Sequence, residues 1–65
     1  MDRARLERVY AAGARFAVVC NAGTLFERVD DVFCRLNEAI DAAKDFDDGA
    51  DVMAITRRGE LTTEF

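Results

Sequence analysis

The fold is decided by residues 24–45, which read TLFERVDDVFCRLNEAIDAAKD. Apolar residues recur in this stretch at steps of three and four, which is the spacing of one face of a helix. These residues are Leu25, Val29, Val32, Phe33, Leu36, Ile40 and Ala43. Thr24 and Glu27 also fit a capping box, in which each side chain accepts a hydrogen bond from the other residue's backbone amide. The pattern predicts one long amphipathic helix over residues 24–45, with its inner face in the core.

The outer face of this expected helix is acidic. At about 100° per residue, several carboxylates fall within about 40° of one line along the helix. They are Glu27, Asp31, Glu38, Asp41 and Asp45. Asp30 and Asp48 extend the acidic region, and residues 27–51 hold nine acidic against three basic residues. We predict that these seven carboxylates bind a partner with a basic surface, because their field attracts such surfaces and competes there with nucleic acid. The alternative is that they only keep a surface helix hydrated.

Shorter elements are expected on both sides of this helix. A first helix should begin after Asp2 and end at Gly13, because aspartate caps helix starts and glycine ends helices. Residues 16–20, FAVVC, are a continuous apolar run that is typical of a strand buried on both faces. Residues 52–56 and 61–65 favour strands and enclose a turn with a glycine, which predicts a hairpin.

The expected order is therefore helix, strand, helix, strand, strand. A right-handed crossover through the long helix would make the first two strands parallel, with the third antiparallel beside one of them. We predict a small two-layer α+β domain, in which a mixed three-stranded sheet carries both helices on one face. A chain of 65 residues is expected to form a single domain over residues 1–65.

Catalytic chemistry is hard to build from this composition. The chain contains no histidine and no serine, so a nucleophilic cysteine or hydroxyl would lack its usual base. A pair of carboxylates acting as acid and base would need a cleft, whereas this stripe is expected to be exposed. The acidic residues 45–51 do not fit a calcium-binding loop, because the register that suits Gly49 puts Lys44 first and Ile55 last. We expect no enzyme activity, no cofactor and no metal.

Compartment and cysteine use give a further expectation. No apolar run is long enough to span a membrane, and the N-terminus leads into a polar helix. Cys20 and Cys34 are too few for a disulfide framework or a four-thiolate zinc site, so reduced thiols are expected. Eight of the nine basic residues are arginine and alanine is abundant, which favours a bacterial or phage protein in the cytoplasm of a bacterial host.

These observations favour a small acidic binding or inhibitor protein that occupies a basic, nucleic-acid-binding surface of a larger complex. It would contact neither nucleic acid nor membrane directly. At the level of class it is similar to the small acidic proteins that phages use against host defences, such as anti-CRISPR proteins, a resemblance carried by size and acidity rather than by a motif. The alternative is a homodimeric regulatory or antitoxin-like module with an apolar contact surface from the hairpin or the first helix, whose assembly substitutions at Ile55 or Phe65 should disrupt.

Overall fold

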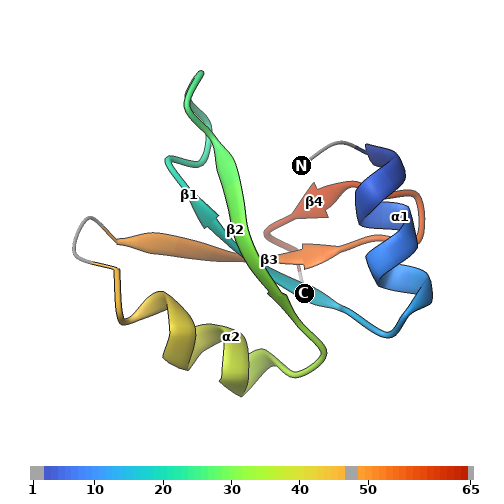
Figure 1. Ribbon diagram of the computed structural model, residues 1–65. Helices are drawn as coiled ribbons and strands as arrows, with labels where there is room; N and C mark the ends of the chain where they lie inside the picture. The colour runs from blue at the N-terminus through green and yellow to red at the C-terminus, as the bar shows by residue number, and fades with distance from the viewer. Residues whose placement is uncertain (1–2, 47–48, 65) are drawn as a thin grey trace.

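The computed structural model describes residues 3–46 and 49–64 as a small α+β fold (Figure 1). Its elements are α1 (Arg3–Ala11), β1 (Phe16–Cys20), β2 (Arg28–Phe33), α2 (Leu36–Ala43), β3 (Ala50–Ile55) and β4 (Leu61–Thr62). The four strands form one sheet in the order β2-β1-β3-β4, and every neighbouring pair is antiparallel. The central strand is β1, which pairs with both β2 and β3.

The long helix predicted over residues 24–45 is wrong in its first half. Residues 28–33 form the edge strand β2, and only residues 36–43 are helical. The predicted parallel pairing of strands 16–20 and 52–56 is wrong for the same reason, because the hairpin loop 21–27 and β2 reverse the chain before α2, so β3 runs antiparallel to β1. A hairpin connection makes neighbouring strands antiparallel. The sheet therefore has four antiparallel strands in place of three mixed ones.

A β-bulge explains why the apolar residues of β2 have the spacing of a helix. Val29 stands opposite Val19 and Val32 stands opposite Ala17, while no β1 residue stands opposite Asp30. Ala17 and Val19 share one face of the sheet because side chains alternate along a strand. The extra residue in β2 therefore brings Val29 and Val32 to that same face although they are three residues apart. A spacing of three is also what one face of a helix requires.

The two helices lie on opposite faces of the sheet. Leu6 of α1 is buried in a cluster with Ala17, Val19 and Ile55. Val18 faces the other way and is fully buried, and α2 contacts β1 and β3 with its Ala39 also fully buried. Figure 1 shows the sheet between α1 on the right and α2 at the lower left. The prediction that both helices cover one face in two layers is therefore wrong.

Three shorter predictions are confirmed. The first helix ends before Gly13, which has a positive φ of 114°. Residues 16–20 form a strand whose three central residues are buried. The hairpin pairs β3 with β4, and Gly59 in its turn has a φ of 78°, as a turn glycine should.

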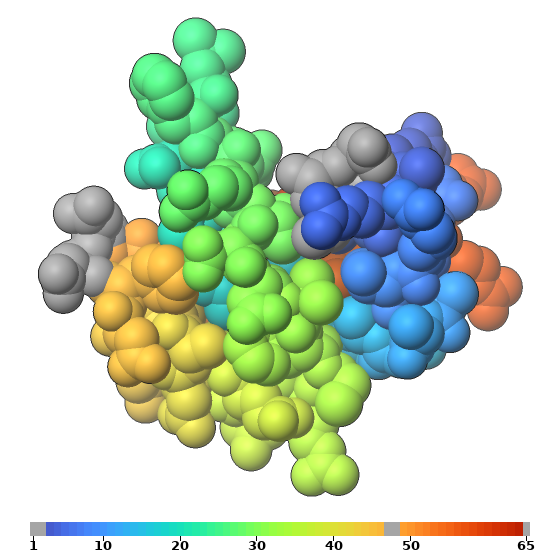
Figure 2. Space-filling model, in the orientation of Figure 1, coloured from blue at the N-terminus to red at the C-terminus, as the bar shows by residue number. Residues whose placement is uncertain are grey.

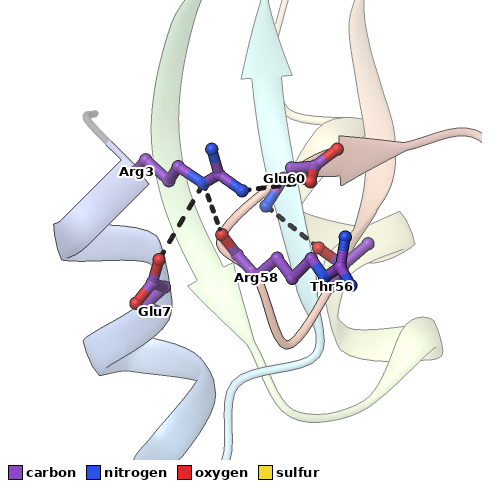
Figure 3. A network of polar contacts seen from close by, with 5 residues as sticks. All are labelled: Arg3, Glu7, Thr56, Arg58 and Glu60. Carbon is purple, nitrogen blue, oxygen red and sulfur yellow. Dashed lines mark hydrogen bonds and ion pairs between the residues drawn. The ribbon is translucent and has the colours of Figure 1, made fainter.

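Polar contacts fix α1 to the turn between β3 and β4 (Figure 3). The Arg3 Nε donates to the Arg58 carbonyl oxygen at 2.8 Å, and its Nη2 lies 3.4 Å from Glu60 Oε1. Gly59 is buried beneath this contact, and a Cβ at that position would collide with the Arg3 carbonyl oxygen. The turn itself is closed by Thr56, whose Oγ1 accepts from the Glu60 amide at 3.0 Å. The absence of a side chain at Gly59 thus lets α1 sit directly on the hairpin.

Candidate functional site

The predicted partner-binding carboxylates form two groups in the structure and not one helical line. The strand carboxylates comprise Glu27, which directly precedes β2, and Asp30 and Asp31 within it. The helix carboxylates comprise Glu38 and Asp41 of α2 and Asp45 just after it. All six residues are exposed. Asp48 lies outside the described residues. The predicted exposure is confirmed for the six, whereas their common line is wrong because the helix does not extend through residues 24–35.

The strand carboxylates lie along the free edge of the sheet. The Asp30 Oδ1 is 3.4 Å from Arg28 Nη2, and the Asp31 Oδ1 accepts a hydrogen bond from the Val32 amide at 2.8 Å. The outer edge of β2 pairs with no strand of the described chain. Charged residues and a bulge on an edge strand also prevent unwanted pairing with other chains. Protection of the edge is therefore a sufficient structural reason for Asp30 and Asp31.

The helix carboxylates lie on the side of α2 away from the sheet. Glu38 and Asp41 are three residues apart and hence adjacent on the helix surface, while Ala39 is buried against the sheet. The Asp41 Oδ1 lies 3.9 Å from Lys44 Nζ, and both side chains are largely exposed. An ion pair this open contributes little, about 0–1 kcal/mol. These carboxylates keep their charge available to a partner.

Charge is segregated between two regions of the molecule. Residues 27–46 hold six acidic and three basic residues, whereas residues 3–15 hold four basic residues and one acidic residue. In Figure 2 the segment 27–46 covers the centre and lower left of the visible face, and α1 covers the right. Exposed Arg57 and Arg58 of the β3–β4 turn adjoin α1 through the contacts of Arg3. The molecule therefore presents an acidic side formed by β2 and α2 and a basic side formed by α1 and the turn.

The β1–β2 hairpin presents a feature that sequence reasoning missed. Leu25, predicted to face the core, is 100% exposed, and Phe26, predicted to lie within the long helix, is 79% exposed. They lie at the end of the hairpin, which projects from the body of the molecule in both views (Figures 1 and 2). The signal that could have identified the hairpin is Asn21-Ala22-Gly23, since asparagine and glycine directly after a strand mark a turn.

Hydrogen bonds order this hairpin tip, defined here as residues 24–26. The Thr24 hydroxyl donates to the Asn21 carbonyl oxygen at 2.7 Å and accepts from the Phe26 amide at 3.1 Å. Asn21 and Gly23 both have positive φ, which reverses the chain. The predicted capping box is wrong, because the Glu27 amide donates to the Thr24 carbonyl oxygen and not to its hydroxyl. Thr24 thus shapes a turn and does not begin a helix.

The described residues form no grouped metal site and no membrane-spanning helix. Within residues 3–46 and 49–64 no three histidine, cysteine, aspartate or glutamate side chains are grouped as metal ligands. Cys20 is half-buried, Cys34 is exposed, and both are free thiols. Neither helix of the described chain is long and apolar enough to cross a bilayer. Ile55, expected to contact a second copy, is 4% exposed and belongs to the chain's own core, and Phe65 lies outside the described residues.

Comparisons of this chain with protein-family models, with curated proteins and with solved structures find no match.

Proposed function

We propose that this protein is a non-enzymatic binding protein or inhibitor whose acidic side occupies a basic surface of a larger complex. The observation that supports it best is the segregation of charge, with the strand and helix carboxylates together on β2 and α2. A field of this kind accelerates association with a basic surface and repels nucleic acid. The natural target is a nucleic-acid-binding assembly in the cytoplasm of a bacterial host, where the carboxylates compete for the phosphate-binding site. Phage anti-CRISPR proteins are the class of inhibitor that this resembles.

Most of the six described carboxylates form no ion pair within residues 3–46 and 49–64. Among the described residues no arginine or lysine pairs with Glu27, Glu38 or Asp45. The two pairs that do form, at Asp30 and Asp41, have N–O distances of 3.4 and 3.9 Å and lie in solvent. A basic partner would therefore gain the attraction without first breaking strong internal pairs.

Helix stability accounts for Glu38 but not for Asp41 and Asp45. Negative charge is favourable at a helix start and unfavourable at its end, because of the helix dipole. Glu38 is in the first turn of α2, but Asp41 is near the end and Asp45 lies just beyond the C-cap, Lys44. The last turn of α2 contains no basic residue. Asp41 and Asp45 therefore destabilise the helix slightly, and binding supplies a reason for their presence that folding does not.

The test is a capture experiment with a competitor. The immobilised protein is incubated with lysate of a bacterium that encodes it, with and without added duplex DNA or RNA, and the retained proteins are quantified by mass spectrometry. We expect a nucleic-acid-binding protein to be retained and to be displaced by the added nucleic acid. Retention that is indifferent both to nucleic acid and to salt would contradict an acidic contact surface, because charge-driven binding weakens as salt increases.

A further inference from the structure

We propose that Leu25 and Phe26 form an apolar anchor that inserts into a pocket on a partner protein, a pocket whose rim is basic. The sign of the rim charge rests on the proposed function, whereas the anchor itself rests on the geometry of the hairpin. The partner is therefore a protein whose surface has a concave apolar centre surrounded by arginine or lysine residues.

The two side chains of the anchor are exposed. Leu25 is 100% and Phe26 79% exposed, and the next most exposed large apolar residue of the described chain is Ile40 at 40%. Isolated apolar residues on a surface are ordinary, but a leucine and a phenylalanine side by side at a projecting end form a patch. Large apolar side chains that become fully buried on binding are the usual energetic centres of an interface.

The hairpin tip is held by hydrogen bonds before any partner binds. Thr24 joins the two sides of the turn, with its hydroxyl bonded to the Asn21 carbonyl oxygen and to the Phe26 amide at 2.7 and 3.1 Å. The backbone carries a second contact, since the Thr24 amide donates to the same Asn21 oxygen at 3.2 Å. A loop that already holds its bound conformation loses less entropy on association. The tip therefore suits an anchor better than a disordered loop would.

The shape and the charge of the tip limit which surface can receive it. The tip is convex and stands clear of the body, as Figures 1 and 2 show, so only a concave surface can bury both side chains. Glu27 follows Phe26 directly, and the strand carboxylates Asp30 and Asp31 continue along the same edge. When the tip is inserted, Glu27 lies nearest the rim of the pocket, and the segment 27–31 carries three carboxylates against one arginine, Arg28, which pairs with Asp30. Complementary charge at that rim must be positive.

The same charges disfavour two other occupants. An anionic bilayer would repel the strand carboxylates as the tip approached it. A second copy that met this one tip to tip would bring the two Glu27 carboxylates together, and like charges in an interface oppose association. Both occupants are nevertheless measured in the test.

The experiment selects partners from a library of small binding domains with a randomised concave surface, using the full chain as the target. Affinities of independent binders are then measured for wild type, for L25S/F26S and for the matched control I40S, which removes an exposed apolar side chain elsewhere. E27Q/D31N is measured in parallel. Circular dichroism verifies that each variant is folded, and L25A/F26A, which truncates both side chains without adding a hydroxyl group, serves as the second tip variant if L25S/F26S is not.

We expect most binders to lose affinity about thirtyfold on L25S/F26S and to be unaffected by I40S, as truncation of an anchor predicts. Binders that keep their affinity for L25S/F26S, or that lose as much affinity for I40S, would overturn the anchor. Dependence on the tip without dependence on E27Q/D31N would support the anchor and count against the acidic surface of the proposed function. Dependence on the carboxylates alone would support the acidic surface of the proposed function and would overturn the anchor.

Lipid binding and self-association are tested by direct measurement. Wild type is mixed with vesicles of phosphatidylcholine, with and without phosphatidylglycerol, and is separately sedimented over a range of concentrations. We expect neither vesicle binding nor a dimer that L25S/F26S abolishes. Vesicle binding would assign the tip to a membrane, and a dimer that L25S/F26S abolishes would assign it to a second copy. Either result would overturn the proposal that the tip inserts into a protein pocket.

Discussion

Val29 and Val32 lie three residues apart in β2 and yet face the same core, opposite Val19 and Ala17 of β1. They do so because Asp30 is bulged out of the ladder between them. The bulge has two consequences for the molecule. It lets both valines contribute to the cluster beneath α1, and it interrupts the regular pattern of the exposed edge, where it discourages pairing with other chains.

Deletion of Asp30 should destabilise the fold, whereas D30A should not. Without the extra residue the strand would regain strict alternation, and one of the two valines would turn away from the core. Loss of one half-buried valine corresponds to about 1–2 kcal/mol of unfolding free energy. D30A keeps the residue count and should change it by less than about 0.5 kcal/mol. Urea unfolding followed by circular dichroism measures both, and equal effects of the two changes would contradict the role given to the bulge.

Gly59→Ala should be far more damaging than Gly49→Ala. Both glycines have positive φ, 78° and 75°, so both substitutions carry the same backbone strain, about 1 kcal/mol. Only at Gly59 would the new Cβ meet other atoms, the Arg3 carbonyl oxygen and the Glu7 Cγ, the latter at 2.8 Å. We expect a total loss of about 2–4 kcal/mol for G59A, since overpacking adds to the strain. Comparable losses for the two variants would show that α1 is not seated on the turn.

Arg15→Ala should loosen the junction between α1 and β1. The Arg15 Nη1 donates to the carbonyl oxygens of Tyr10 and Ala14 at 2.7 and 2.9 Å, and its guanidinium lies 3.8 Å from the centre of the Tyr10 ring. Both interactions are exposed, so their loss should lower the unfolding free energy by about 1 kcal/mol. The control is R57A, an exposed arginine for which no polar contact is found within residues 3–46 and 49–64, and it should be neutral in the same thermal or urea unfolding experiment. If R15A left the free energy of unfolding unchanged, the Arg15 contacts would not stabilise this junction.

Thr24→Val should release the hairpin tip without unfolding the domain. The substitution keeps the shape of the side chain but removes both hydrogen bonds of the hydroxyl. We expect amide hydrogen exchange at Phe26 to accelerate about fivefold, the change that corresponds to one hydrogen bond of about 1 kcal/mol. Thr63→Val, at an exposed threonine near the C-terminus, should leave the tip amides unchanged. If exchange at Phe26 were already unprotected in wild type, the tip would not be ordered in solution.

Local signals explain which elements could be predicted from the sequence. The strand Phe16–Cys20 is a short apolar run that no helix pattern matches, and Gly13 and Gly59 fix the ends of their neighbours through positive φ. These features depend on a few adjacent residues, so they are readable without knowledge of the tertiary structure. The exposure of the six described carboxylates was predictable for the same reason.

The stretch 24–35 could not be assigned from its pattern alone. The bulge at Asp30 gives Val29 and Val32 a helical spacing, and Leu25 with Phe26 extends that apparent stripe although both lie in solvent. The periodicity is the same for a helix and for a bulged strand, so the distinction rests on the turn signal Asn21-Ala22-Gly23 before this stretch and on pairing with β1. The two groups of carboxylates follow from this, since their separation on β2 and α2 depends on where the helix begins.

The acidic side is tested most directly by reversal of matched charges. The variant E38K/D45K changes two helix carboxylates, whereas D51K/E64K makes the same changes in net charge and residue type at exposed positions outside both groups. The affinity of each variant for the protein captured by wild type is measured by titration calorimetry at two salt concentrations. We predict that E38K/D45K loses binding and its salt dependence while D51K/E64K retains most of both. Equal affinities of the two variants would show that net charge alone, and not the carboxylates of β2 and α2, determines binding, and would contradict the proposed function.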